Sequence, residues 1–209
     1  PGCVSLWAAA ITPPRNIMNR RLFSIVVLLI VVALFAVPIF FAPEPSAPGQ
    51  PGMTLLPAQG GLPAFALRDQ HNQAFDVARL RGKWSLLFFG FTRCPDICPT
   101  TLATLKQVHQ LLGEKNKDIQ YVFITVDPER DTPELLGGYV DYFNPDFLGV
   151  SGPASELDKL TQALGVYYRL GPNTTGDYQV DHSAAVFLVD PQARLRALFS
   201  SPQNAQHMA

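Results

Sequence analysis

Charged side chains are scarce in this 209-residue sequence, at 16% of all residues, and the formal net charge is −1. Proteins that bind nucleic acid present clusters of Lys and Arg to the phosphate backbone, and this composition implies no such basic patch. We therefore expect no nucleic-acid partner. Internal repeats are lacking too, and the one low-complexity stretch is a segment rich in Pro, Gly, Ala and Ser at 43–63.

Cysteine is also scarce, with three in the chain. Cys3 stands ahead of Met18, which we expect to be the natural start, so that residues 1–17 would not be translated. Cys94 and Cys98 remain, separated by three residues. A disulfide between them would close so short a loop that it would stabilise the fold little. A reactive or metal-binding role is therefore favoured over a structural cross-link.

The long apolar run at 22–42 can cross a bilayer as a helix. Three arginines precede it within 1–21, and no Lys or Arg follows before Arg68. This asymmetry predicts that residues 1–21 are cytoplasmic and that the bulk of the chain is exported. A cleaved signal peptide is the alternative, but its apolar region is usually only ~7–15 residues long. We expect an uncleaved anchor followed by an extended tether at 43–63.

From 64 to 209 the pattern alternates between strands and amphipathic helices, which predicts an α/β fold, a mixed sheet with helices on its faces. The expected elements are strands at 83–89, 119–126, 147–150, 184–189 and 194–199, hairpins at 65–77 and 166–180, and helices at 99–112, from 132 onward and at 154–164. The residues after 199 leave little room for a further helix. A cysteine pair at the first strand-to-helix junction of such a sheet is typical of thioredoxin-like folds.

The cysteine pair directly follows the strand at 83–89. Pro99 has no N–H and suits the first helical position, so Cys98 is predicted to cap the helix. A sulfur there faces unpaired backbone N–H groups and the positive end of the helix dipole, which favours the thiolate. Cys94 lies one loop turn earlier, within reach for a disulfide or a shared metal. Two hypotheses stay open, thiol–disulfide exchange and the binding of a soft metal ion.

A metal ion would need a further ligand, and His182 has the best context of the four histidines. It directly precedes the strand at 184–189, and in a thioredoxin-like sheet the loop that enters this strand lies beside the cysteine loop. Two thiolates and one imidazole suit Cu(I), or Cu(II) with an added oxygen ligand, whereas structural zinc usually takes four protein ligands. The other histidines are expected in a turn, on the helix and in the tail: His71, His109 and His207.

Acidic residues flank both parts of this candidate site. Asp181 is expected either to orient the neighbouring histidine ring as an outer partner or to be an ordinary strand-end residue. Asp127, Glu129 and Asp131 alternate as in calcium loops, but Gly is missing from the sixth position of the loop and Glu from the twelfth. We therefore expect Arg130 and its neighbouring aspartates to fix the loop beside the site rather than to bind metal.

Three motifs together resemble the signature of the SCO/SenC family of copper-binding assembly proteins: residues 90–99 (GFTRCPDICP), 126–133 (VDPERDTP) and 180–183 (VDHS). They follow in the family's order and spacing, and the likeness extends from about residue 62 to 199. A single membrane anchor with the domain outside is also similar to that family. Thioredoxin-type reductases differ, because they have two residues between the cysteines rather than three.

The resemblance implies a thioredoxin-like domain at 64–209 that binds Cu(I) or Cu(II) through Cys94, Cys98 and His182. It implies a metallochaperone rather than an enzyme, anchored in the bacterial inner membrane with its domain in the periplasm. The expected partners are a copper donor protein and the copper-bearing subunit of cytochrome c oxidase, whose dinuclear copper centre it would help to assemble. The alternative is a membrane-tethered thiol–disulfide oxidoreductase in which Cys94 and Cys98 are redox-active and form a disulfide.

Overall fold

The computed structural model describes residues 24–25, 27–30, 52–57, 60–172 and 178–209. The chain divides into two compact units, residues 1–47 and 48–209. Within the described residues, no helix is both long and apolar enough to cross a bilayer. Most of the predicted anchor at 22–42, and the tether up to residue 51, lie outside the described residues.

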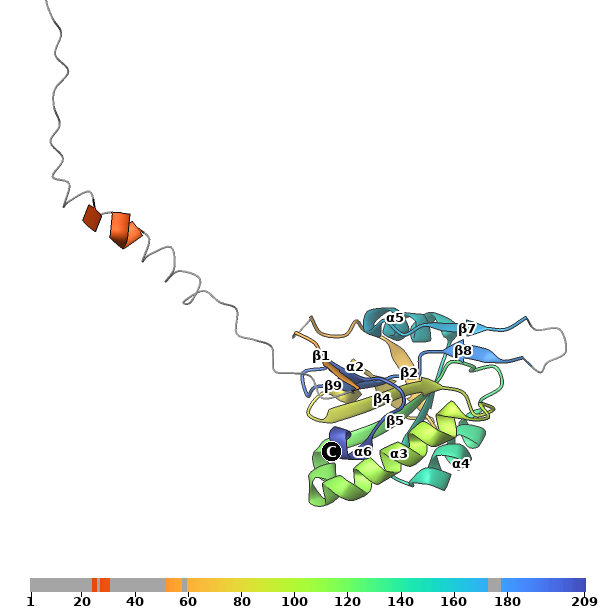
Figure 1. The fold of residues 1–209 in the computed structure, drawn as a ribbon. Coiled ribbons are helices and arrows are strands. Elements are labelled where there is room, and N and C mark those ends of the chain that lie inside the picture. The colour runs from red at the N-terminus through yellow and green to blue at the C-terminus, as the bar shows by residue number, and fades with distance from the viewer. Residues whose placement is uncertain (1–23, 26, 31–51, 58–59, 173–177) are drawn as a thin grey trace, which may run out of the picture. The chain divides into compact units, whose positions relative to one another are not determined.

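The second unit is built on a mixed sheet of eight strands among the residues described (Figure 1). The two central strands, β4 and β5, run parallel, as do β5 and β6, whereas the flanking pairs are antiparallel. In their order across the sheet the strands are β1 (Met53–Leu55), β10 (Leu195–Phe199), β9 (Val186–Val189), β4 (Trp84–Gly90), β5 (Ile119–Thr125), β6 (Leu148–Ser151), β2 (Ala66–Asp69) and β3 (Ala74–Asp76).

The central strands are buried on both faces, as their unbroken apolar runs predict. Successive side chains of a strand point to opposite faces, so Leu86 and Phe88 of β4 join one core cluster while Leu87 and Phe89 join the other. All four of these side chains are at most 3% exposed. The sheet therefore separates two apolar layers, each of which needs a covering layer of its own.

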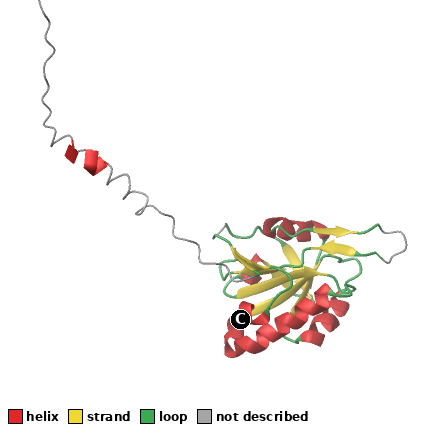
Figure 2. Ribbon diagram, viewed as in Figure 1, coloured by secondary structure: helices red, strands yellow, loops and turns green. Residues whose placement is uncertain are grey.

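Helices cover one face of the sheet and a mixed layer covers the other (Figures 1 and 2). Buried residues of α3 (Ile97–Leu112), α4 (Pro133–Phe143) and the short α6 (Ala205–Met208) contribute to the cluster that contains Phe88. The cluster that contains Phe89 is covered by α5 (Ala154–Leu164) and by a separate two-stranded ribbon of β7 (Tyr168–Leu170) and β8 (Val180–His182). Two short helical segments complete the domain, α2 (Val77–Leu80) and the 3-10 helix η1 (Gly113–Asp118).

The mixed α/β sheet with flanking helices is confirmed, and local sequence signals account for several helix boundaries. Thr132 accepts a hydrogen bond from the N–H of Leu135 at 3.3 Å and Pro133 opens α4, as expected of an N-cap followed by proline. Gly165 ends α5 in the left-handed conformation, with φ of 70°, which glycine adopts without the steric cost of a Cβ.

The short segments α2 and η1 were not predicted, and neither were two elements near the ends of the domain. β1 lies inside the segment predicted as a tether and pairs with β10. The sequence gives little sign of this strand, because edge pairing uses backbone groups and leaves side chains such as Leu55 exposed. The tail after β10 also forms a helix, α6, where none was expected. Asn204 caps it by accepting from the N–H groups of Gln206 and His207, and Ala205 is buried against the core.

Replacing Leu102 of α3 by Ala tests the packing of the helical layer. Leu102 is 1% exposed and belongs to the cluster that contains Phe88, so Leu102→Ala is expected to lower the free energy of unfolding by about 2–5 kcal/mol. Leu111→Ala is the matched control on the same helix, because Leu111 is 54% exposed and its truncation should cost less than about 0.5 kcal/mol. Urea unfolding followed by circular dichroism measures both, and equal losses would contradict this packing.

Candidate metal centre

Cys98 lies in the first turn of α3, at the carboxyl end of β4. The helix begins at Ile97 after the N-cap Asp96, whose side chain makes no capping hydrogen bond. The prediction that Cys98 caps the helix is therefore wrong by two positions. Pro99 is the third helical residue and is tolerated there, because the first N–H groups of a helix have no intrahelical partner. Cys98 is fully buried, and it is the sulfur of Cys94 that accepts from the N–H groups of Asp96 and Cys98 at the helix end.

Gly90 makes room for the Cys98 sulfur. A Cβ added to Gly90 would lie 2.5 Å from Cys98 Sγ and 2.9 Å from a ring carbon of Phe123. Both contacts are shorter than van der Waals packing allows, so the sulfur rests directly on the backbone where β4 ends. Glycine at this position is a packing requirement of the site, which the sequence motif contains but does not explain.

Cys94 lies in the loop between β4 and α3 and is only partly buried. Its N–H donates to the carbonyl of Phe91 at 3.2 Å, which folds the loop back toward the strand. Both Cys94 and Cys98 are free cysteines in this structure, so the predicted disulfide between them is not formed here. One cysteine is thus accessible from solvent while the other is enclosed.

His182 ends β8, and its ring lies against the buried cysteine. His182 Nε2 is 3.4 Å from Cys98 Sγ, and Nδ1 is 3.1 Å from the carbonyl oxygen of Ser183. Because a carbonyl only accepts, Nδ1 carries the hydrogen in the neutral ring, and Nε2 presents a lone pair toward the sulfur. The rings of Phe88 and Phe91 flank the imidazole at centroid distances of 6.2 and 5.8 Å, so the ring is held on two sides.

The ligand atoms of Cys94, Cys98 and His182 all lie within 4.8 Å of one another. Metal–ligand bonds of about 2.0–2.3 Å place the donor atoms of one ion roughly 3.4–4.6 Å apart, so small side-chain adjustments suffice to enclose an ion. The other histidines are elsewhere: His71 is in the turn between β2 and β3, His109 pairs with Asp146, and His207 is on α6. His182, the histidine with the best context in the sequence, is therefore the one that the fold brings to the cysteines.

Asp181 does not orient His182 in this structure. Its carboxylate accepts from Arg169 at 2.8 Å across the β7–β8 ribbon, and its side chain is 62% exposed. The nitrogen that a carboxylate would have oriented is instead bonded to the Ser183 carbonyl. Neighbouring residues of a strand point to opposite sides, which explains why Asp181 faces solvent while His182 faces the cysteines.

The loop after β5 braces the cysteine loop, as expected for the acidic motif. The buried carboxylate of Asp131 accepts from the N–H of Thr92 at 3.0 Å, from the Thr92 hydroxyl, and from the hydroxyl of Thr125 at 2.6 Å. Arg130 bonds Asp127 through its Nε. Thr92, two residues before Cys94, is a supporting residue that the sequence analysis did not single out.

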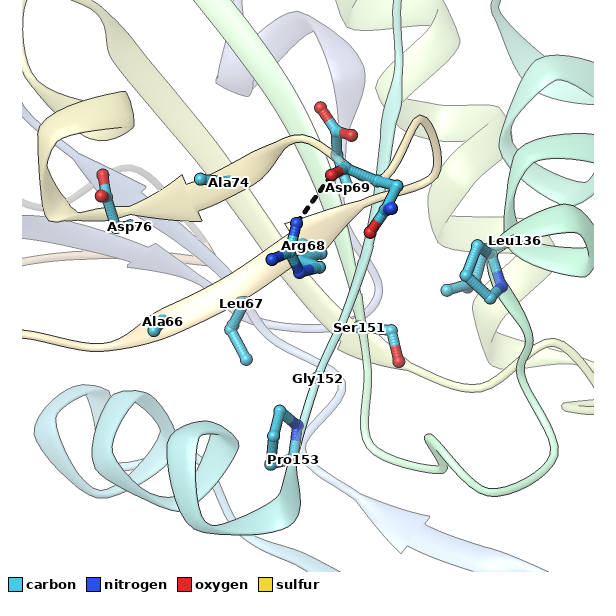
Figure 3. A pocket seen from close by; sticks show the side chains of 12 residues that line it. Ala66, Leu67, Arg68, Asp69, Ala74, Asp76, Leu136, Ser151, Gly152 and Pro153 are labelled. Carbon is cyan, nitrogen blue, oxygen red and sulfur yellow. Dashed lines mark hydrogen bonds between the residues drawn. The ribbon is translucent and has the colours of Figure 1, made fainter.

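A hollow of about 450 Å³ lies away from this cluster, between β2, β3, the start of α4 and the segment after β6 (Figure 3). Arg68 lines it and donates to the carbonyl of Asn72 at 2.9 Å. Ligand sites are often the largest hollow of a fold, but Cys94, Cys98 and His182 are not among the residues that line this one. The chemistry of the cysteines therefore does not involve this hollow.

A sequence profile of the SCO1/SenC family matches residues 56–209. A protein of Stutzerimonas stutzeri named "Putative copper-binding protein" is 42% identical over 154 residues, which cover 73% of this chain and 76% of that protein. The chain belongs to the SCO1/SenC family. The solved structure of Bradyrhizobium japonicum ScoI with copper bound is similar, with a TM-score of 0.65 and 36% identity over 70% of this chain and 94% of that one. Apo Sco1 of Thermus thermophilus has a TM-score of 0.68 at 36% identity, covering 78% and 95%.

The two cysteines of this SCO1/SenC protein differ strongly in acidity. The hydrogen bond from the Cys98 thiol lowers the pKa of Cys94 to about 3 against the effect of burial, with help from the N–H groups of Asp96 and Cys98. The pKa of Cys98 is raised, because its proton is held by that same bond and because the residue is buried. The metal-free site therefore contains a Cys94 thiolate beside a Cys98 thiol at neutral pH.

Alkylation kinetics test this assignment. Because the pKa of Cys94 is lowered to about 3, its reaction with iodoacetamide in the reduced, metal-free protein should stay nearly constant from pH 8 to pH 5. An ordinary thiol with a pKa of about 8.5 loses roughly a thousandfold over this interval. Mass spectrometry assigns the modified residue, and Cys98→Ala, which removes the donor to Cys94, should restore a steep dependence. A steep fall in the parent protein would contradict the assignment.

Substitution of Gly90 tests the packing beneath the sulfur. Gly90→Ala forces a methyl group onto Cys98 Sγ and the Phe123 ring, so it should lower the free energy of unfolding by about 1–3 kcal/mol. Gly138→Ala on α4 is the matched control, because a Cβ there meets nothing within 4 Å. The control should be neutral or stabilising by up to about 1 kcal/mol. Chemical denaturation measures both, and a neutral Gly90→Ala would show that the sulfur is not fixed as described.

Proposed function

We propose that this protein is a copper metallochaperone whose cargo ion is held by Cys94, Cys98 and His182. One observation carries the proposal: the two sulfurs and the imidazole nitrogen, from segments 84 residues apart in the chain, lie within 4.8 Å of one another. Soft thiolates together with imidazole favour Cu(I), and an added oxygen ligand would suit Cu(II). Three ligands also leave a coordination position open.

An open coordination position on the copper ion suits transfer of the ion to a partner better than its storage. A partner's ligand can bind the ion before the chaperone's own ligands leave, so that copper is never released to solvent. Cys94, which is only partly buried, is the ligand that a partner reaches first, whereas Cys98 and His182 are held by the fold. Binding also displaces the proton that Cys98 holds in the metal-free site, because a thiol binds metal as the thiolate.

The proposed recipient is the copper-bearing subunit of cytochrome c oxidase, and a copper donor protein loads the site. Membership of the SCO1/SenC family supports this role, and the relative from Bradyrhizobium japonicum is described with copper bound. We further propose that residues 22–42 anchor the protein in the bacterial inner membrane with residues 64–209 in the periplasm. The support for this location is the apolar run itself and the arginines that precede it.

Thiol–disulfide exchange is a second candidate, favoured by the difference in acidity between the two cysteines. The Cys94 thiolate would attack a partner's disulfide and release one of its sulfurs as a thiolate. Cys98, once deprotonated, would then attack the mixed disulfide, leaving a Cys94–Cys98 disulfide here and two reduced cysteines on the partner. Such reduction prepares target thiols for copper, so the two activities are compatible.

Competition titration with a Cu(I) chelator separates the two functions. Cys94→Ser and Cys98→Ser should abolish tight binding, and His182→Ala should weaken it by about a hundredfold or more, since even groups that only orient a ligand contribute 10–100-fold. His109→Ala is the control, because His109 lies on α3 and pairs with Asp146 instead. Should His182→Ala bind copper as the parent does, while each cysteine variant loses disulfide reductase activity, the oxidoreductase function would replace the metallochaperone.

A further inference from the structure

His182 lies on a ribbon that stands apart from the main sheet. Among the described strands, β8 pairs with β7 alone, through three residue pairs in which Tyr168 lies opposite His182. A two-stranded hairpin is marginally stable by itself in water. The position of the imidazole therefore depends on the contacts that hold this β7–β8 ribbon against the rest of the domain.

Tyr178, on the same side of the ribbon as His182, makes a buried polar contact that joins the ribbon to the rest of the domain. It lies four residues earlier in the chain and is 6% exposed, and its hydroxyl donates to Asp127 Oδ1 at 2.6 Å. The guanidinium of Arg130 stacks on the phenol ring, 3.6 Å from its centroid, and bonds the other carboxylate oxygen of Asp127 through Nε. The carboxylate is 1% exposed. The three side chains, Tyr178, Asp127 and Arg130, therefore contact one another and are largely shielded from solvent. We call this group the Tyr178 latch.

The loop that carries this latch also holds the cysteines. Asp127 begins the turn after β5, and Asp131 four residues later binds Thr92, which is two residues before Cys94. The N–H of Asp131 donates to the carbonyl of Asp127 at 3.0 Å, which joins the two aspartates directly. A single turn thus fixes the cysteine loop through one carboxylate and the ribbon through the other.

We propose that Tyr178 is a positioning residue for the copper site. Its bond to Asp127 sets where β8 lies, and so sets the distance between the His182 ring and the two sulfurs. The inference deepens the proposed function and rests on it, because it assigns the latch to the same ion. A positioning role differs from a general stabilising role, since loss of the Tyr178 hydroxyl should lower copper affinity through His182 and not through the cysteines.

A double-mutant cycle of Tyr178 and His182 tests whether Tyr178 acts on copper affinity through His182. Tyr178→Phe keeps the ring on Arg130 but removes the bond to Asp127, and it should weaken Cu(I) binding about tenfold. In a protein that already carries His182→Ala, the same change should alter affinity less than twofold. Tyr121→Phe is the matched control, because its hydroxyl likewise donates to a side-chain oxygen, in this case the carboxamide oxygen Asn116 Oδ1, at 2.7 Å. It lies toward the opposite end of β5 and should leave copper affinity unchanged.

Hydrogen exchange of the metal-free protein gives a readout that does not depend on copper. The ribbon amides of Ser183 and Gly171 donate to the carbonyls of Tyr167 and Gln179, both at 2.8 Å. Tyr178→Phe should speed their exchange, whereas Tyr121→Phe should not.

Copper affinity and hydrogen exchange together distinguish a failure of the role assigned to Tyr178 from a failure of the proposed function. Unchanged ribbon exchange in Tyr178→Phe, or an equal loss of copper affinity with and without His182, would overturn the assignment of Tyr178. Faster ribbon exchange together with copper binding that His182→Ala does not weaken would instead overturn the proposed function and leave the latch supported as a structural feature.

Discussion

The sulfur of Cys98 is fixed from two sides, by the backbone of Gly90 beneath it and by the ring of His182 beside it. The sulfur can approach the backbone because β4 ends in Gly90, and it meets an imidazole because β8 ends in His182. Strands β4 and β8 do not pair with each other, since β4 belongs to the main sheet and β8 to the separate ribbon. The site is therefore a junction between the main sheet and the ribbon, and its geometry depends on how these two parts are joined.

The same junction accounts for both kinds of chemistry that the cysteines support. A thiol proton on Cys98 and a thiolate on Cys94 form the metal-free state, in which the partly exposed sulfur is the nucleophile. In the proposed metallochaperone a soft cation replaces that proton, the pair becomes two ligands, and the Nε2 lone pair of His182 becomes the third. Copper and disulfide chemistry use the same pair of sulfurs: the reduced pair can start either one, whereas a Cys94–Cys98 disulfide offers no thiolate to a metal ion.

Much of the fold was predictable from the sequence, because its signals are local. The apolar runs of β4 and β5, the Thr132 cap and the glycine that ends α5 each determine structure within a few residues of themselves. β1 was missed because edge pairing relies on backbone groups, and its side chains are largely exposed. The short helix α6 was missed although Asn204 is a good cap, because four residues carry too little periodicity.

The three candidate ligands were also predictable, since the motifs are specific and the order of strands brings them together. The supporting contacts were not. Whether Asp181 faces the ring or the solvent depends on the register of the ribbon, and the role of Tyr178 depends on a turn 51 residues earlier in the chain. Such contacts arise from tertiary packing, which periodicity and local motifs do not encode.

X-ray absorption spectroscopy at the copper edge of the Cu(I)-loaded protein examines the junction itself. Two sulfur scatterers near 2.3 Å and one nitrogen near 2.0 Å are expected, and the nitrogen should vanish in His182→Ala. A copper shell made of sulfur alone in the parent protein, unchanged by His182→Ala, would contradict a site shared between the sheet and the ribbon.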